Sequence, residues 1–267
     1  MIIDGHCHAG KGDGLTGPWN TDAPVGPYLR RARATGIERT IILPSFHSDY
    51  ARANAGLAEI AARHPGRFIC FAAVHPQRDA GRIRTMVGTA VERWGCRGIK
   101  VHKMDGIATR EVCETARRFG LPVLYDVVGD AYLMEMLAPE YQDVNFILPH
   151  LGSFADDWRA HVQVIDQLAR FPNVYADTAG VRRFDYLVRA IRRAGARKLV
   201  FGSDGPYLHP GLELHKIRLL GLPRDQEAMV LGSTLLRLIG GLGTRNRGPD
   251  RAPVRRASPR VTARALL

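Results

Sequence analysis

Eight short apolar segments rich in β-branched residues recur along the chain, most of them about 25 to 30 residues apart. They cover residues 1–8, 40–44, 68–74, 98–102, 122–128, 144–150, 173–177 and 199–204. Amphipathic helical patterns lie between them, for example at 54–64, 82–94, 110–119, 157–171 and 184–194. Regular alternation of strand and helix predicts a parallel sheet. Eight such units predict a single-domain α/β protein in which the sheet closes into a (β/α)8 TIM barrel.

The chain length and the loops agree with a barrel. The 267 residues are close to the roughly 250 that one such barrel needs. No GxGxxG pattern follows the first strand, which argues against a dinucleotide-binding fold. Residues 9–26 form one long loop with five glycines and Trp19. We interpret this loop as a mobile cover over the barrel mouth.

The positive charge is concentrated at the carboxyl end. The formal net charge is +12, and residues 244–267 contain seven arginines against one aspartate. This segment has little apolar periodicity, so we expect a barrel at 1–243 and a basic, disordered tail at 244–267. The other basic residues are not interleaved with aromatic residues, and we therefore expect no nucleic-acid partner.

Cysteine usage and the first residues favour a cytoplasmic location. The four cysteines occur singly, without a CxxC pair, as is typical of reduced thiols in the cytosol. The chain starts directly with a strand pattern rather than a basic and apolar leader. No apolar run approaches 18 residues, so we expect no membrane partner.

Chemically versatile residues end several of the predicted strands. In this fold the reactive side chains lie where the strands end. His6 and His8 end the first strand and, being two residues apart, project to the same side, where they can share one metal ion. Asp204 ends the last strand, beside the first, and His150 ends the sixth. Ordinary alternatives are a histidine buried in the core and an aspartate that only forms a turn.

The fourth strand contributes a further pair. Lys100 and His102 alternate with Ile99 and Val101, so they are expected to face the barrel lumen. Two interpretations stay open. The pair binds the substrate, or Lys100 lies in the barrel floor, where a carboxylate balances its charge.

Taken together, these motifs resemble the amidohydrolase superfamily, in particular its branch of short TIM-barrel metal-dependent hydrolases and decarboxylases. The resemblance extends to about Gly241 and includes the segments at 3–8, 73–76, 98–102, 148–152, 201–204 and 230–238. It implies that His6, His8 and Asp204 bind a metal ion and that Asp204 and His150 are catalytic, with His150 as an acid/base beside the ion or as an additional ligand. Members of this branch usually have a metal-binding histidine where this chain has Asp126. Because a carboxylate is also an acceptable ligand, we expect Asp126 to complete the site.

The resemblance implies one divalent ion per chain, Zn²⁺ first and Mn²⁺ as the alternative. The predicted reaction is attack of metal-activated water on an amide, ester or lactone carbonyl of a small acidic substrate. Lys100, His102, Trp19 and Tyr207 are the candidate substrate-binding residues. A homodimer is the expected form if the chain self-associates.

Three alternatives remain open at this point. In the first, the same site belongs to a non-oxidative decarboxylase of aromatic or unsaturated carboxylic acids. A carbamylated Lys100 would instead bridge two ions. In the third, replacement of the usual histidine by Asp126 has abolished catalysis, and the barrel only binds a ligand or partner.

Overall fold

The computed structural model describes residues 1–15 and 22–240. The strands are β1 (Ile2–Ala9), β2 (Ile37–Pro44), β3 (Phe68–Cys70), β4 (Ala72–Ala73), β5 (Ile99–His102), β6 (Val123–Asp126), β7 (Phe146–Leu148), β8 (Val174–Asp177) and β9 (Leu199–Val200). The α-helices are α1 (Val25–Ala34), α2 (Tyr50–Ala62), α3 (Ile83–Trp94), α4 (Arg110–Phe119), α5 (Leu133–Glu140), α6 (Trp158–Arg170), α7 (Phe184–Ala194), α8 (Pro210–Leu219), α9 (Arg224–Ala228) and α10 (Thr234–Leu238). Trp19 and the predicted tail lie outside the described residues.

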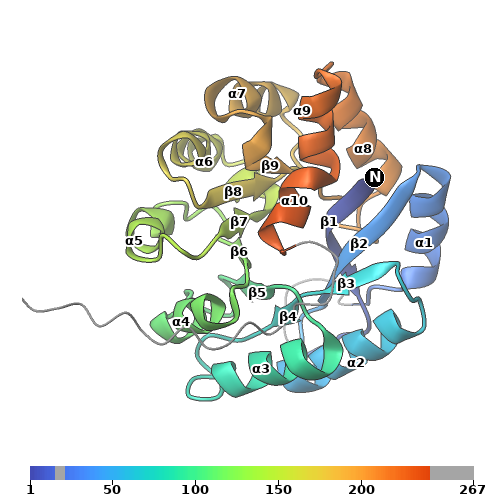
Figure 1. Cartoon of the computed structure of the whole chain (residues 1–267), viewed down its shortest axis with the longest axis vertical. Helices are drawn as coiled ribbons and strands as arrows, with labels where there is room; N and C mark the ends of the chain where they lie inside the picture. The colour runs from blue at the N-terminus through green and yellow to red at the C-terminus, as the bar shows by residue number, and fades with distance from the viewer. Residues whose placement is uncertain (16–21, 241–267) are drawn as a thin grey trace, which may run out of the picture.

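The strands pair in parallel and close into a barrel. One sheet has the order β1-β2-β3 and the other the order β4-β5-β6-β7-β8-β9. Phe71 separates β3 from β4, and its N–H still donates to Ile42 O at 3.1 Å, so β3 and β4 are parts of one barrel strand. At the other seam Gly5 N donates to Phe201 O at 2.8 Å. The predicted (β/α)8 barrel is confirmed, and Figure 1 shows the helices as a ring outside it.

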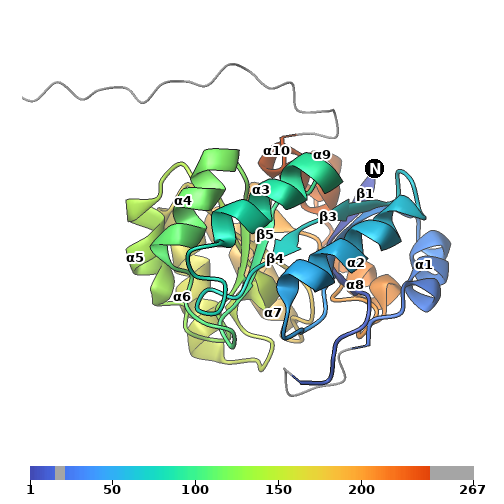
Figure 2. The ribbon, with the colours of Figure 1, turned by 90° about the horizontal axis from the view of Figure 1, so that it is seen from below.

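The lower part of the barrel interior is apolar. A cluster of buried side chains fills it near the starts of the strands: Ile3, Ile41, Ile69, Leu124, Ile147 and Val200, together with Leu235, Leu238 and Ile239 from the carboxyl-terminal region. Helix α10 therefore plugs the end where the strands begin, and Figure 1 shows it across the middle of the ring. Figure 2 shows α10 at one side of the barrel and the dark-blue segment that directly follows β1 at the opposite side. The polar residues predicted to form the site therefore lie toward the opposite end, where the strands finish.

Local capping explains where several helices begin and end. Helix α2 starts at Tyr50, four residues before the predicted start, because the Asp49 carboxylate accepts from the backbone N–H of Ala51 at 2.9 Å. Helices α3 and α4 end at Gly95 and Gly120, whose φ angles are 66° and 59°. Glycine adopts this left-handed conformation at little cost, as expected from the sequence.

The sixth barrel strand, β7, is shorter than predicted. It ends at Leu148, and the next residues form a tight turn in which His150 and Leu151 have φ angles of 58° and 50°. Non-glycine residues adopt this region at a cost of roughly 1–2 kcal/mol each. The Asp177 carboxylate stabilises the turn, since its Oδ1 accepts from His150 N at 2.8 Å. The turn directs the His150 ring into the barrel mouth instead of leaving it at the end of a strand.

Within residues 1–15 and 22–240, no helix combines the length and the apolar character needed to cross a membrane.

Candidate metal centre

Three of the predicted ligands converge at the seam between the first and last strands. Nε2 of His6 and Nε2 of His8 lie 3.6 Å and 3.4 Å from Asp204 Oδ1. One ligand atom from each residue falls within 4.8 Å of the others. The backbone fixes this convergence, because Asp204 N donates to His6 O at 2.7 Å across the seam.

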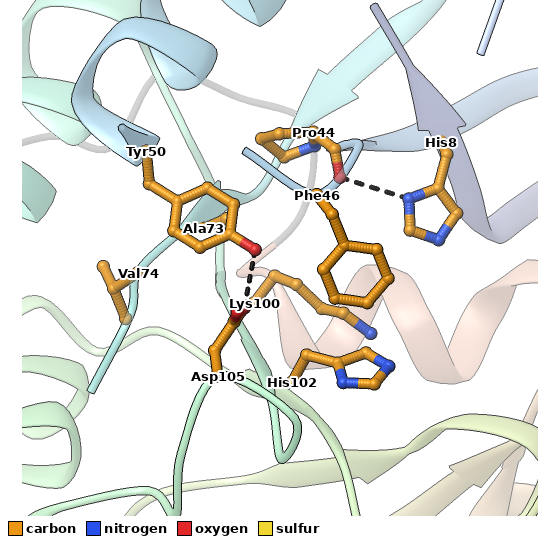
Figure 3. Close-up of a pocket in the computed structure, with 9 residues that line it drawn as sticks. All are labelled: His8, Pro44, Phe46, Tyr50, Ala73, Val74, Lys100, His102 and Asp105. Atoms are coloured by element: carbon orange, nitrogen blue, oxygen red, sulfur yellow. Dashed lines mark hydrogen bonds between the residues drawn. The ribbon is translucent and has the colours of Figure 1, made fainter. Parts of the chain in front are cut away.

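The rings of His6 and His8 are oriented by what their Nδ1 atoms contact. His8 Nδ1 lies 3.1 Å from Pro44 O, as the dashed line in Figure 3 shows. A carbonyl oxygen can only accept, so His8 Nδ1 carries the proton and Nε2 presents its lone pair to Asp204. His6 Nδ1 lies 2.8 Å from Asp177 Oδ2, which has the same effect. Metal-binding histidines are typically held by such an acceptor behind the ring.

The donor atoms and their protonation suit a divalent cation. His6 Nε2 is buried and has no hydrogen-bond partner among the described residues, which is costly for a polar atom unless an ion or proton satisfies it. Burial lowers the pKa of His6 and so disfavours the proton. Burial raises the pKa of Asp204, but its interactions with the neighbouring His8, His6 and His150 side chains bring it down to about 2. Two imidazole nitrogens and one carboxylate are a ligand set for Zn²⁺ or Mn²⁺.

Asp177 also lies close to His6 and His150, and together they form a second cluster of potential ligands. Its oxygens are already used, however. Oδ2 faces His6 Nδ1, while Oδ1 accepts from the backbone N–H of His150 at 2.8 Å and of Ala179 at 3.0 Å. We therefore assign Asp177 to positioning His6 and the His150 turn. Asp177 was not predicted from the sequence, although it ends a predicted strand, which is the same signal that identified Asp204.

His150 lies against the metal cluster. Its ring centroid is 5.0 Å from that of His6, and its Nδ1 lies 2.8 Å from Ala179 O, so Nε2 faces the barrel mouth. Burial lowers the pKa of His150, but the carboxylates of Asp126, Asp204 and Asp177 outweigh burial and raise it. The imidazole can therefore hold a proton at Nε2.

Asp126 does not join the three converging ligands. It pairs with His102 across the β5–β6 register, and its Oδ2 lies 3.4 Å from His102 Nε2 and 3.7 Å from His150 Nε2. Burial raises the pKa of Asp126, but the electrostatic interactions with His102, Lys100 and His150 outweigh burial and lower it. Within the described residues, Asp126 is thus the carboxylate that faces His102 and His150 on the β5–β6 side of the barrel, across from the seam.

The ring of His102 is oriented in the opposite sense to those of His6 and His8. Its Nδ1 accepts from Met104 N at 3.2 Å, so the proton of the neutral ring sits on Nε2 and points toward Asp126. Burial lowers the pKa of His102 to about 4, which keeps the ring neutral. His102 is therefore a hydrogen-bond donor in this arrangement and not a ligand through Nε2.

Lys100 is a buried cation in the lumen. Its side chain is 5% exposed, and within the described residues its ammonium group makes no ion pair or hydrogen bond. Burial lowers its pKa. The carboxylates of Asp126, Asp177, Asp204 and Asp105 act on its charge without forming an ion pair with it, so the interpretation as a floor lysine balanced by carboxylates stays open. Figure 3 shows Lys100 in a cavity beside His8, Phe46 and His102.

Aromatic rings surround the imidazoles. The centroid of Tyr207, a predicted substrate-binding residue, is 5.3 Å from that of His8. Phe46 lies 4.8 Å from His102, and Phe154 lies 4.9 Å from His150. Phe46 and Phe154 were not predicted, because a phenylalanine in a loop carries no sequence signal that separates a site wall from ordinary packing. Trp19 falls outside the described residues.

The sequence of the barrel matches the model of the amidohydrolase family over residues 3–240. The chain belongs to the amidohydrolase family. Both the resemblance inferred from the motifs and the prediction of an enzyme of this family are thereby confirmed. A search of curated protein sequences gives no match to this amidohydrolase.

Solved structures of similar fold include both decarboxylases and a hydrolase. The 2,6-dihydroxybenzoate decarboxylase from Rhizobium has a TM-score of 0.70 and 17% identity, over 90% of this chain and 98% of that one. A probable 2-pyrone-4,6-dicarboxylic acid hydrolase from Acinetobacter baumannii has a TM-score of 0.70 and 13% identity, over 90% and 99%. A dihydroxybenzoic acid decarboxylase from Polaromonas, with bound manganese, has a TM-score of 0.66 and 17% identity, over 90% and 96%. At these identities the likeness shows the shared fold.

Proposed function

We propose that this amidohydrolase is a metal-dependent hydrolase that attacks the carbonyl of an amide, ester or lactone in a small acidic substrate. One observation carries the proposal: His6 Nε2 is buried without a hydrogen-bond partner in the described chain, and it points to the place where His8 Nε2 and Asp204 Oδ1 also converge. His6, His8 and Asp204 would hold the ion. Zn²⁺ is our first expectation, and the manganese in the Polaromonas structure supports Mn²⁺ as the alternative.

A bound divalent ion supplies Lewis acidity, which lowers the pKa of water and polarises a carbonyl group. The chain provides the proton transfers. Asp204 is ionised at neutral pH, and its Oδ1 faces the two imidazoles. Its Oδ2 is left to accept the proton of the attacking water as the general base.

His150 is the proposed general acid. Its Nε2 faces the barrel mouth because Nδ1 is held by Ala179 O. The surrounding carboxylates raise its pKa, so the ring can carry a proton on Nε2 and deliver it to the leaving nitrogen or oxygen. Asp204 and His150 thus take opposite roles in one proton-transfer sequence.

Lys100 supports an acidic substrate. A buried ammonium without an ion-pair partner in the described residues is unfavourable until an anion reaches it. A substrate carboxylate would pair with Lys100, and His102 Nε2–H lies on the same side of the lumen as a second donor. Tyr207 and Trp19 are proposed to contribute to the wall of the substrate site from the loops.

The decisive experiment combines metal counting with the Asp204→Asn variant. We expect about one Zn²⁺ or Mn²⁺ per purified chain by elemental mass spectrometry. Hydrolysis of lactones, esters or amides should fall by at least about 10³-fold in Asp204→Asn, with an unchanged circular dichroism spectrum. Retained turnover in the variant would exclude Asp204 as the base. Two ions per chain would favour the bridged site with carbamylated Lys100, and none after remetallation would favour a degenerate binding barrel.

Non-oxidative decarboxylation is the second candidate. The site pairs a metal cluster with a proton-holding His150 and an unpaired Lys100, and these groups would equally anchor a carboxylate and protonate the adjacent carbon. Two of the similar structures described above are decarboxylases. Release of CO₂ from a carboxylic acid, without formation of a new acid, would decide for this reaction.

A further inference from the structure

A buried carboxylate behind the metal cluster joins the first barrel strand to the segment that follows the last one. Asp4 lies on β1 and faces away from the lumen, since it contacts Tyr28 on α1 in the outer ring of helices. Its carboxylate accepts four hydrogen bonds. Oδ1 accepts from the backbone N–H of His6 at 3.1 Å and of Ser203 at 2.8 Å. Oδ2 accepts from the hydroxyl group of Tyr28 at 2.7 Å and from that of Ser203.

These bonds hold the backbone on both sides of the cluster. One donor is the N–H of the ligand His6, and another is the N–H of Ser203, which directly precedes the ligand Asp204. Strand pairing alone does not fix Asp204, because β9 ends at Val200 and Asp204 has a φ angle of 54°, which residues other than glycine seldom adopt. The shared oxygen Oδ1 therefore sets how closely the backbone at His6 approaches the backbone at Ser203.

The four partners of Asp4 require an acceptor at this position. All four donate, and a carboxylate offers two acceptor oxygens and no donor. An amide in its place would turn an NH2 group toward the two hydroxyl groups, of which that of Ser203 already accepts from Gly205 N at 3.0 Å. Loss of the side chain would leave the N–H groups of His6 and Ser203 without their acceptor, and the two segments would no longer be held together.

We propose that Asp4 is a positioning residue for the metal centre and sets the separation between His6 and Asp204 through the backbone. Asp4 acts differently from Asp177, whose carboxylate contacts the His6 ring. Within the described residues, no hydrogen bond joins Asp4 to a ligand side chain. This role rests on the proposed function, in which the three converging ligands hold a divalent ion. A residue outside the cluster thus determines how tightly the cluster binds its ion.

Metal affinity separates positioning from a general contribution to stability. The dissociation constant of Zn²⁺ is measured by chelator competition at a temperature where circular dichroism shows each variant to be folded. Asp4→Ala should raise this constant at least about tenfold, the loss that is typical when a residue that orients metal ligands is removed. The visible absorption of bound Co²⁺, which depends on the arrangement of its ligands, should also change. A folded Asp4→Ala protein that binds Zn²⁺ within about twofold of the native chain overturns the proposal.

Asn54→Ala is the matched control. Asn54 on α2 is buried and also binds the backbone of a barrel strand, since its Nδ2 donates to Ala73 O at 2.8 Å and its Oδ1 accepts from Ala73 N at 2.9 Å. Ala73 lies on β4, away from the seam. The substitution should lower the melting temperature but leave the affinity for Zn²⁺ within about twofold. A loss of affinity equal to that of Asp4→Ala would indicate general destabilisation and overturn the proposal.

Two conservative variants keep the test decisive if Asp4→Ala does not fold. Asp4→Asn retains an acceptor for the two N–H groups but places an NH2 group against the hydroxyl groups, so it should raise the dissociation constant about threefold to tenfold. Tyr28→Phe removes a single donor from Oδ2 and should have a smaller effect, within about threefold. Native affinity in Asp4→Asn, or a larger loss in Tyr28→Phe than in Asp4→Asn, overturns the proposal.

The native chain, measured alongside, separates this proposal from the proposed function. If it binds its ion and the Asp4 variants bind equally well, only the positioning role fails. If the variants lose affinity but the native chain hydrolyses no lactone, ester or amide, the positioning role stands and the hydrolase assignment fails. If the native chain binds no ion, both fail.

Discussion

Two sides of the barrel mouth contain histidines in opposite states. On the seam side, His6 and His8 lie on β1, and their Nδ1 atoms face the acceptors Asp177 and Pro44 O. On the opposite side, His102 on β5 accepts a backbone N–H at Nδ1. The seam side therefore directs lone pairs into the lumen, whereas the β5 side directs an N–H there.

The contact made by Nδ1 therefore determines whether Nε2 of a histidine presents a lone pair or an N–H group to the lumen. An acceptor behind the ring prepares the seam side for a cation. A donor behind the ring, together with the ammonium of Lys100, prepares the β5 side for an anion, and Asp126 balances its charge. The same residue type thus serves two purposes within one mouth.

The largest expected difference between the two sides concerns metal binding. His6→Ala should reduce the ion content from about one per chain to near zero, because it removes one of three converging ligands. His102→Ala, the matched substitution on the other side, should retain the ion. Elemental mass spectrometry after dialysis measures both. Equal loss in both variants would erase the distinction between the sides.

A smaller effect is expected from the residue behind His6. Asp177→Asn keeps the size of the side chain but weakens the contact with His6 Nδ1, so the affinity for Zn²⁺ should fall by about 10- to 100-fold. Competition with a chelator gives the dissociation constant. Unchanged affinity would show that Asp177 only stabilises the His150 turn.

The β5 side is tested by changing the charge of Lys100. Lys100→Met should raise KM for acidic substrates about tenfold and leave kcat within a few-fold, since it removes one charge-assisted hydrogen bond from the bound substrate. Lys100→Arg should recover part of the loss. An equal increase in KM for uncharged esters would instead indicate a packing role.

The smallest predicted effect is a shift in pH dependence. Burial lowers the pKa of His150, but the carboxylates, Asp126 first among them, raise it above its ordinary value. An acid must be protonated, so activity should decline as the pH rises through this pKa. Asp126→Asn removes a raising charge and should move that alkaline limb to lower pH by about one unit. If the alkaline limb of the pH profile does not move, Asp126 does not control the pKa of the catalytic acid.

Strand periodicity predicted the barrel because the eight strands alternate with helices at regular spacing. It also placed His6 and His8 correctly near the end of the first strand. The last strand is shorter than the predicted 199–204, because β9 ends at Val200, and Asp204 lies four residues beyond it with a φ of 54°. The structure nevertheless brings the three residues together. Ring orientation could not be predicted, since it depends on contacts such as His8 with Pro44 O, which lies 36 residues away. The position of His150 in a left-handed turn, held by Asp177, likewise has no signature in sequence periodicity.

Asp126 shows the limit of transferring a pattern. The sequence placed it at the position of a usual ligand, but that position says nothing about which side chains neutralise it. In the structure it faces His102 and His150, and its assignment as a ligand remains a prediction for metal counting to test.

The hydrogen bonds that join Gly5 to Phe201 and Asp204 to His6 have a consequence for folding. The three converging ligands come from the first barrel strand and from the segment that follows the last one, about 200 residues apart. They can meet only after the ring has closed, so the unfolded chain has no comparable site. By linkage, an ion at 100 times its dissociation constant would add about 2.7 kcal/mol to the free energy of unfolding. The ion would then stabilise the closed barrel by linking its two ends, and chelation should lower the melting temperature as well as activity.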